Sequence, residues 1–267
     1  MGEAIGEGGQ KKVYRCIHPL HGESVLKLIP SHTSMRDERA RREIQIAEML
    51  EGPFFLKVFA VGDVSTSQGP SIFVLEEYFD GRTLRQVLND AGDHRLRSSE
   101  VRRIIGSVLR ALLVIEEKKL VHRDIKPENV MVSDTRVVVI DFGIARNLDM
   151  ISATNTVAPI GPMTIGYGAP EQIRNEKRKI SICADIFSVG VLTFEMVTGF
   201  SPFRSGCGTV EEVVDRTLHA NPLTNTEHGL SQSLENFIGR CMEKNSHRRP
   251  QSAAMALELF ESILWEN

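Results

Sequence analysis

The sequence has few cysteines and no long apolar stretch, the features typical of proteins stabilised by disulfides or metal ions and of membrane-spanning proteins. Its four cysteines are far apart and form no Cys-x-x-Cys pair, which argues against a disulfide framework, a zinc ribbon or a redox motif. Its longest apolar stretch, residues 186–194, contains Ser188 and Thr193. That stretch is much shorter than the roughly 20 residues of a membrane helix, and no secretory pattern follows Met1. We therefore expect idle thiols, no membrane span in this chain and a cytoplasmic location.

An excess of one charge is also lacking. Thirty-two Lys and Arg residues face 35 Asp and Glu residues, for a formal net charge of -3. No broad cationic surface therefore favours nucleic acid or anionic lipid. The hydrophobic share of 41% and the charged share of 25% are ordinary for a globular protein. We expect a folded chain with no nucleic-acid partner, whose ligands are recognised at local sites.

The hydrophobic pattern changes near residue 80. Before it, β-branched and aromatic runs between turn signals predict strands over 13–17, 25–29, 56–61 and 71–76. Apolar residues at three- and four-residue spacing predict a helix over 37–50. After residue 80, the pattern predicts helices over 84–88, 99–118, 184–198, 210–218, 234–244 and 253–265, and short strands over 130–132 and 136–140. The expected fold class is α+β, with a β-rich part over residues 1–79 and a mainly helical part over 80–267.

The most informative segment is His122-Arg123-Asp124-Ile125-Lys126-Pro127-Glu128-Asn129, followed twelve residues later by Asp141-Phe142-Gly143. A hydroxyl that attacks a γ-phosphate needs a carboxylate to orient it and accept its proton, and cations to neutralise the phosphates. Either motif alone is compatible with a polar turn between strands. In this order and spacing, the two resemble the catalytic loop and metal-binding motif of the eukaryotic-like (Hanks-type) serine/threonine protein kinase family.

This resemblance implies a role for each polar residue. Asp124 matches the family's catalytic base, and Lys126 matches its cation near the transferred phosphoryl group. Asn129 and Asp141 match the magnesium ligands, and their oxygen atoms suit that hard cation. The resemblance further implies ATP and Mg²⁺ as cofactors, and a bilobal fold with a β-rich N-lobe and a mainly helical C-lobe.

The segment from Gly6 to Val13 resembles the family's glycine-rich loop, in which backbone amides approach the phosphates because no side chain intervenes. The resemblance implies nucleotide contacts from Gly6, Gly8, Gly9 and Val13. Two positions depart from the pattern, because Lys11 replaces the third glycine and Gln10 replaces the usual aromatic tip. The sequence leaves open whether Lys11 stiffens the loop or places an ammonium near phosphate.

Val25-Leu26-Lys27 resembles the strand that carries the family's ATP-orienting lysine. Out of context, a lysine on a strand is usually solvated. Glu43, sixteen residues later on the predicted helix, matches the ion-pair partner of that lysine. Glu48 is a weaker rival, because it falls on another face of the helix.

Glu77-Tyr78-Phe79 resembles the hinge, where the main chain of Glu77 and Phe79 would hold the adenine edge. Met131 matches the apolar floor beneath adenine, although an ordinary core methionine fits as well. At the preceding hinge position the family generally has an apolar or hydroxyl residue, and this chain has Glu76. A buried unpaired carboxylate is costly. Either Glu76 finds a basic partner or the alignment is shifted by one residue.

Further landmarks extend the resemblance over nearly the whole chain. Glu171 of the Ala-Pro-Glu motif is expected to pair with Arg249 as part of the scaffold. Lys126 followed by Pro127 is typical of the serine/threonine-directed branch, and Thr164 matches a threonine that contacts the catalytic aspartate and lysine in that branch.

Arg123 beside Asp124 is typical of kinases that phosphorylation regulates. Ser152, Thr154 and Thr156 lie between the Asp141 motif and Glu171 and are the candidate phosphosites. The alternative is that they are ordinary loop hydroxyls.

The sequence therefore predicts an ATP- and Mg²⁺-dependent serine/threonine protein kinase, regulated through its activation segment. It would act on protein substrates with serine or threonine acceptors, and a regulatory protein is a further partner that the resemblance allows. One alternative is a pseudokinase that acts as a nucleotide-binding scaffold, favoured by Gln10, Lys11 and Glu76. Another is a small-molecule kinase of the aminoglycoside type, which generally lacks the Lys126 and Ala-Pro-Glu features.

Overall fold

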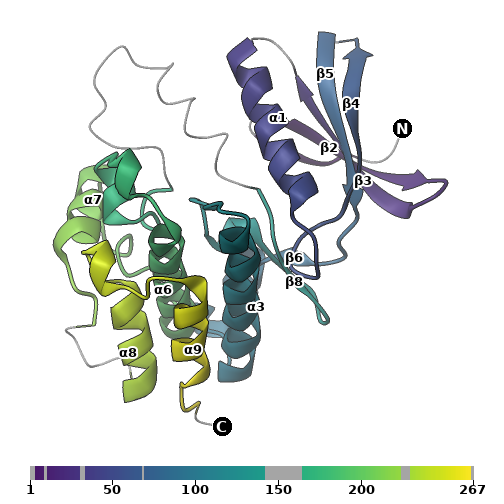
Figure 1. Ribbon diagram of the computed structural model, residues 1–267. Coiled ribbons are helices and arrows are strands. Elements are labelled where there is room, and N and C mark those ends of the chain that lie inside the picture. Colours follow the sequence, from purple (N-terminus) through teal and green to yellow (C-terminus); the bar gives the residue numbers. More distant parts are fainter. Residues whose placement is uncertain are drawn as a thin grey trace. The chain divides into compact units, whose positions relative to one another are not determined.

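The computed structural model describes residues 4–8, 11–30, 34–67, 69–141, 164–223 and 229–265. The chain separates into two compact units, residues 1–81 and 82–267. The first is built mainly of strands and the second mainly of helices (Figure 1). The predicted α+β class, with its β-rich N-terminal part and mainly helical C-terminal part, is confirmed.

The N-terminal unit is an antiparallel sheet with one helix. The sheet has five strands in the order β1-β2-β3-β5-β4. The strands are β1 (Ala4–Gly8), β2 (Lys11–His18), β3 (Gly22–Pro30), β4 (Val58–Thr66) and β5 (Gly69–Glu77). Helix α1 (Ser34–Met49) connects β3 to β4.

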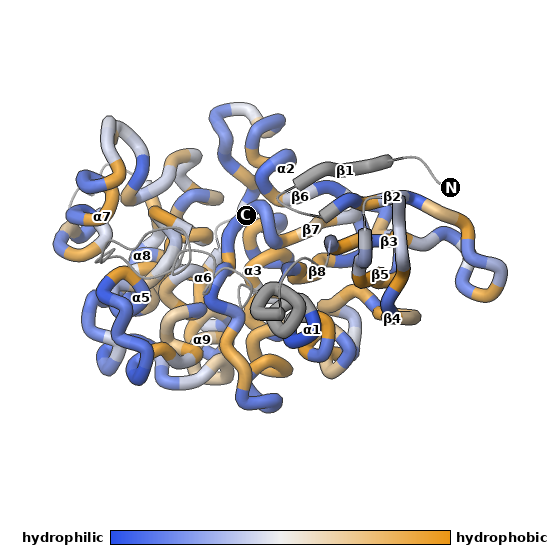
Figure 2. Tube along the Cα trace, turned by 90° about the horizontal axis from the view of Figure 1, so that it is seen from above, coloured by the Kyte–Doolittle hydropathy of each residue, from blue (hydrophilic) through white to orange (hydrophobic). Residues whose placement is uncertain are grey.

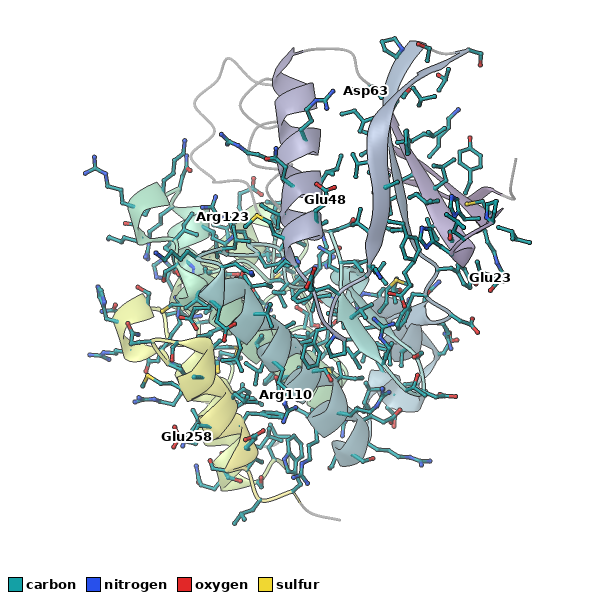
Figure 3. All side chains as sticks on the ribbon, turned by 45° about the vertical axis from the view of Figure 1, so that its right-hand side comes forward. Glu23, Glu48, Asp63, Arg110, Arg123 and Glu258 are labelled. Atoms are coloured by element: carbon teal, nitrogen blue, oxygen red, sulfur yellow. The ribbon has the colours of Figure 1, made fainter. Side chains whose placement is uncertain are left out.

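One face of this sheet packs against α1. Ile44 of α1 forms a buried cluster with Ile72 and Val74 of β5, and Ile29, Val58 and Val61 pack against it. An exposed ion pair joins Arg41 of α1 to Asp63 of β4 at 2.6 Å (Asp63 is labelled in Figure 3). The apolar layer therefore lies between the helix and strands β3, β4 and β5.

Strand β4 differs from its predicted range of 56–61. It begins at Val58 and continues to Thr66, where it pairs with Gly69 across a tight turn. Its second half, Gly62 to Thr66, carries no hydrophobic alternation because β4 is an edge strand and none of these residues is buried. Backbone pairing with β5 extends the strand beyond the apolar pattern.

The C-terminal unit combines a small sheet with a helical core. The sheet has the order β6-β7-β8, with β6 (Arg82–Thr83), β7 (Val130–Val132) and β8 (Val137–Val139). The α-helices are α2 (Leu84–Asp90), α3 (Ser98–Glu117), α5 (Pro170–Ile173), α6 (Ile182–Thr198), α7 (Val210–His219), α8 (Gln232–Cys241) and α9 (Ala253–Glu261). The 3-10 helices are η1 (Gly92–His94), η2 (Pro127–Asn129), η4 (Lys177–Lys179) and η6 (Ser246–Arg248).

Helix α6 is the core of this unit. Every one of its residues except Val197 is buried, as expected of a helix that is apolar nearly all round. It packs against α3, α8 and α9, and Figure 1 shows these helices side by side. In Figure 2 much of α3 and α6 carries the hydrophobic colour, whereas the chain beside the label α5 is largely hydrophilic. Among the described residues, no helix combines the length and hydropathy needed to cross a bilayer.

Two predicted helices are shorter than expected. The helix predicted over 234–244 ends at Cys241, and the helix predicted over 253–265 ends at Glu261. Beyond Glu261, the buried Ile263 and the indole of Trp265 fold back onto the unit, and the indole meets the Phe260 ring edge-on at 5.5 Å. Ile263 and Trp265 pack against the unit from a non-helical segment. Their spacing in the sequence fits a helix, which is why the predicted helix was too long.

Gly199 ends α6 in the left-handed conformation, with φ at 84° and its N–H donating to the Glu195 carbonyl at 2.8 Å. An added Cβ would lie 2.2 Å from the carbonyl oxygen of Asp93. We expect Gly199→Ala to lower the free energy of unfolding by about 1–3 kcal/mol. Gly92→Ala is the matched control, because a Cβ there meets no atom within 4 Å. Equal denaturation midpoints for the two variants would contradict this reading.

Candidate active site

The loop that follows α3 is fastened to the start of α6. The backbone N–H groups of His122 and Arg123 donate to the two carboxylate oxygens of Asp185, each at 2.7 Å. Burial raises the pKa of Asp185 to about 7, and the two N–H donors oppose that rise. Arg123 has a left-handed backbone with φ at 68°, and its carbonyl accepts from Gln172 Nε2 at 2.9 Å. Hydrogen bonds from α5 and α6 therefore hold a strained position directly before Asp124.

His122 is fully buried and uses both ring nitrogens. Nε2 lies 3.2 Å from the carbonyl of Ile140, and Nδ1 accepts from the backbone N–H of Asp124 at 3.3 Å. These partners assign the neutral tautomer with its proton on Nε2. Burial lowers the pKa of His122 to about 4.

This lowered pKa predicts a loss of stability in acid. The unfolded chain takes up a proton on His122 as the pH falls through about 6.5, whereas the folded protein resists it until about 4. Above pH 6.5 the neutral His122 makes its full contribution to the free energy of unfolding. We expect acidification to remove up to about 3 kcal/mol of that free energy. His122→Gln should lack this component in urea unfolding measured from pH 7.5 to 4.5. The same pH slope in both proteins would contradict the assignment.

Asp124 is the centre of a buried polar cluster. Its Oδ2 accepts hydrogen bonds from Lys126 Nζ at 2.8 Å and from Asn129 Nδ2 at 2.9 Å. Its Oδ1 accepts from the hydroxyl of Thr164, and Lys126 Nζ lies 2.9 Å from the same hydroxyl. The structure thus brings three predicted site residues together, and the contact predicted for Thr164 is present. The carboxylate is held by three donors.

Asn129 and Asp141 supply the oxygen atoms of the predicted magnesium site. Asn129 Nδ2 donates to both the carbonyl and Oδ2 of Asp124, each at 2.9 Å, which commits its amide nitrogen and leaves Oδ1 for a cation. The Ile140 N–H donates to the Asn129 carbonyl at 2.9 Å. This hydrogen bond holds the backbone directly before Asp141 next to that of Asn129. An amide oxygen and a carboxylate fit Mg²⁺. Within the described ranges, no three or more His, Cys, Asp or Glu side chains form a group that could hold a metal ion by themselves.

The predicted nucleotide residues of the N-terminal unit follow the register of its strands. Gly6 of β1 pairs with Val13 of β2, and Val13 pairs with Lys27 of β3. Directly paired residues share a face of the sheet, so Val13 and Lys27 lie on the same side. Gly8 ends β1 opposite Lys11. Gly9 lies outside the described residues.

Lys27 forms an ion pair with Glu76, with Nζ and Oε1 2.5 Å apart. Of the two alternatives left open for Glu76, the structure supports the first, a basic partner. The backbone of Glu43 lies in α1 directly before the buried Ile44, and its side chain lies outside the described part of the chain. The pairing predicted for Glu43 stays a prediction.

The predicted adenine contacts lie in both units. Glu77 ends β5, and its N–H donates to the carbonyl of Lys57 at 2.8 Å. Phe79 is buried, and its carbonyl accepts from the Gly81 N–H at 3.0 Å. Met131 is half-buried on β7, paired with Thr83 and Val138. Their contacts with adenine stay predictions.

The candidate phosphosites Ser152, Thr154 and Thr156 lie outside the described residues. The described chain ends at Asp141 on one side of this segment and resumes at Thr164 on the other. Their modification stays a prediction.

Sequence reasoning missed a hydrogen-bond network centred on Arg85 of α2. The guanidinium donates to Glu128 and Glu195, each at 2.9 Å, and to the hydroxyl of Tyr167 at 2.5 Å. Tyr167 in turn donates to Glu195. Burial raises the pKa of Tyr167, so its hydroxyl stays a donor. The network joins the loop of Asp124 to α2 and α6. Glu128 was visible in the motif, but no local pattern marks its partner.

The scaffold pair predicted between Glu171 and Arg249 is confirmed. Two parallel hydrogen bonds of 2.7 and 2.9 Å join the side chains, which are 4% and 0% exposed. The guanidinium also donates to the carbonyls of Cys183 and Glu243, at 2.9 and 2.7 Å. Arg249 thereby connects α5 to α6 and to the chain that follows α8.

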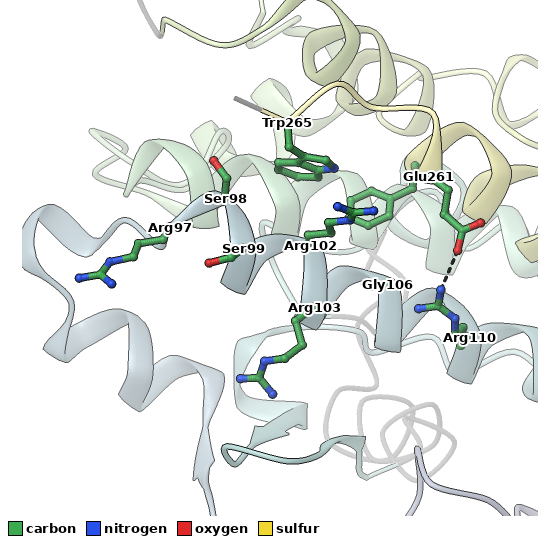
Figure 4. A pocket seen from close by; sticks show the side chains of 10 residues that line it. Arg97, Ser98, Ser99, Arg102, Arg103, Gly106, Arg110, Glu261 and Trp265 are labelled. Carbon is green, nitrogen blue, oxygen red and sulfur yellow. Dashed lines mark hydrogen bonds and ion pairs between the residues drawn. The ribbon is translucent and has the colours of Figure 1, made fainter. Parts of the chain in front are cut away.

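A surface cavity of about 1180 Å³ lies elsewhere in the C-terminal unit, between α3 and the chain after α9. Exposed arginines, including Arg97, Arg102 and Arg110, line it together with the indole of Trp265 (Figure 4). Arg110 is paired with Glu261 at 2.6 Å. None of the predicted site residues lines this cavity.

The fold agrees with the comparisons to known proteins. Residues 1–260 match the family described as protein kinase domain. The serine/threonine-protein kinase PknB of Mycobacterium leprae is 33% identical over 264 residues, which are 95% of this chain and 41% of that protein. The serine/threonine-protein kinase pkn3 of Myxococcus xanthus is 32% identical over 262 residues, 93% of this chain and 47% of that protein. The chain spans less than half the length of these relatives. It belongs to the protein kinase family and carries a domain of the eukaryotic-like (Hanks-type) serine/threonine class.

Proposed function

We propose that this domain transfers the γ-phosphate of ATP to serine and threonine hydroxyls of protein substrates, with Mg²⁺ as the cofactor. The observation that carries the proposal is the hydrogen bonding of the Asp124 carboxylate. Lys126 Nζ donates to it at 2.8 Å and Asn129 Nδ2 at 2.9 Å, and the Thr164 hydroxyl donates to its other oxygen. A carboxylate fixed by several donors presents its remaining lone pairs in one direction. A pseudokinase would have no use for this arrangement.

Asp124 accepts the hydrogen bond of the incoming hydroxyl and takes its proton as the hydroxyl oxygen bonds to the γ-phosphorus. The bond between that phosphorus and the β,γ-bridging oxygen breaks, and ADP leaves with the bridging oxygen. Lys126 touches the carboxylate from the side of Oδ2 and brings a positive charge to the place where phosphoryl oxygens gather negative charge. Thr164 bridges the base and this lysine, which keeps both side chains in one geometry.

Asn129 Oδ1 and the Asp141 carboxylate would hold Mg²⁺, which when bound neutralises phosphate charge and orients the triphosphate. Lys27 contacts the phosphates, with Glu43 as a partner on α1. The backbone of Gly6, Gly8 and Gly9 would approach the phosphates, Val13 and Met131 would supply apolar contacts to adenine, and the main chain of Glu77 and Phe79 would hold its edge.

Lys126 followed by Pro127, with Thr164 at the base, favours aliphatic hydroxyls as acceptors. Modification of Ser152, Thr154 or Thr156 regulates the domain, with Arg123 as the cation that would pair with the added phosphate. We place the domain in the cytoplasm, because its four cysteines are free and ATP is its substrate.

The test is transfer of labelled phosphate from ATP to a generic basic protein, followed by analysis of the modified amino acids. We expect label on serine and threonine and none on tyrosine, and loss of transfer when EDTA removes Mg²⁺. Nucleotide binding without transfer would favour the pseudokinase, and label on a small molecule alone would overturn the protein substrate.

A further inference from the structure

The carboxylate of Glu76 is buried, and a buried charge without a partner lowers the stability of the fold. Its side chain is 9% exposed, and that of its partner Lys27 is 18% exposed. The two groups lie 2.5 Å apart, close enough for a charge-assisted hydrogen bond. Removing one member of such a buried pair leaves the other without compensation.

The strand register explains why the two side chains meet. Strands β3 and β5 are antiparallel, and Val25 lies opposite Glu76 while Lys27 lies opposite Val74. Lys27 and Glu76 are therefore diagonal neighbours on one face of the sheet. The same face carries Ile72 and Val74, which pack against Ile44 of α1. The pair thus lies at the end of an apolar layer, where a charge interaction is stronger than in water.

The two carboxylates assigned to Lys27 differ in what carries them. Glu76 lies on β5, which is hydrogen-bonded to β3 on one side and to β4 on the other. Glu76 and Lys27 therefore belong to the same continuous sheet, and their separation is set by its register. The position of Glu43, the partner predicted on α1, depends instead on how the helix packs against the sheet.

We propose that Glu76 is a positioning residue for Lys27, holding its ammonium at the sheet in an orientation that lets it donate to the phosphates of ATP. This inference rests on the proposed function, because it assigns Lys27 to the nucleotide. An ammonium has three N–H donors, so it can bond a carboxylate and a phosphate oxygen at the same time. Glu76 acts through Lys27 and does not itself touch the nucleotide.

The variant that tests this is Glu76→Gln, which keeps the shape and removes the charge. The probe is the magnesium complex of adenosine 5′-(β,γ-imido)triphosphate, with its dissociation constant measured by calorimetry. We expect Glu76→Gln to weaken binding about tenfold and to raise the KM for ATP by a similar factor, with a smaller change in kcat. Glu23→Gln is the matched control, because Glu23 on β3 forms an exposed ion pair with Arg15.

A double-mutant cycle with Lys27→Met separates positioning from a general structural effect. In the Lys27→Met background, Glu76→Gln should change the dissociation constant by less than about twofold. Thermal unfolding without nucleotide identifies the temperature at which all variants are folded, and binding is compared there. A tenfold loss that persists without Lys27, or wild-type affinity in Glu76→Gln, would overturn the proposal. Binding without any phosphate transfer would contradict the proposed function alone.

Discussion

Asp124→Asn is expected to lower kcat for phosphate transfer about 10²–10⁴-fold, the range of a lost general base. Asparagine keeps the shape of the side chain but has no carboxylate to take the proton of the acceptor hydroxyl. Its amide also presents N–H donors toward the Lys126 ammonium or the Thr164 hydroxyl, which donate to Asp124 in the wild type. The loss should appear in single-turnover transfer at saturating ATP, with little change in nucleotide affinity.

Asp134→Asn is the matched control for this variant. Asp134 is exposed in the turn between β7 and β8, in the same unit as Asp124. It should transfer phosphate at the wild-type rate. Equal rates for Asp124→Asn and the wild type would remove Asp124 from the chemistry or reveal a contaminating kinase.

Arg249→Met is expected to lower the free energy of unfolding by about 3–5 kcal/mol, the range seen when one partner of a buried ion pair is removed. Arg249 is among the largest fully buried side chains of the described residues, and it bonds the Glu171 carboxylate with two parallel hydrogen bonds. Methionine leaves that carboxylate buried and without its partner. Urea unfolding at neutral pH measures the change.

The neighbouring Arg248 provides the control, because it is exposed in the same short segment. Arg248→Met should change the free energy of unfolding by less than about 0.5 kcal/mol. Adding Glu171→Leu to Arg249→Met should recover part of the loss, since no lone charge then remains buried. An Arg249→Met protein as stable as the wild type would show that the pair contributes nothing to the fold.

The cluster around Asp124 was predictable because its members are close in sequence. Asp124, Lys126 and Asn129 fall within six residues, so one loop carries both the chemistry and its geometry. Thr164 and the pair of Glu171 with Arg249 are distant, and they were found through the family resemblance. No local pattern of the sequence would have joined them.

The partner of Glu76 could not be read from the sequence, because the contact depends on the register between β3 and β5. The sequence restricted it to two alternatives, and the structure selects the ion pair with Lys27. Arg85 was missed for a related reason. Its partners Glu128 and Glu195 are 43 and 110 residues away, and an arginine on an amphipathic helix usually belongs to a solvated face.

Element boundaries were the least predictable feature of the fold. The two-residue strand β6 has no hydrophobic alternation, and it exists only because Arg82 and Thr83 pair with β7. Pairing with β5 extends β4 beyond its apolar residues. After α9, Trp265 packs on Phe260 from outside the helix, so an apolar residue at helical spacing does not mark a longer helix. In each case a tertiary contact outweighs the local pattern.

The most direct test of the central claim is a crystal structure of the domain with Mg²⁺ and a non-hydrolysable ATP analogue. We predict Mg²⁺ about 2.0–2.1 Å from Asn129 Oδ1 and from a carboxylate oxygen of Asp141, with the γ-phosphate facing Asp124 and the β3 lysine on the phosphates. A nucleotide bound away from Asn129 and Asp141, or a metal held by other residues, would contradict the account.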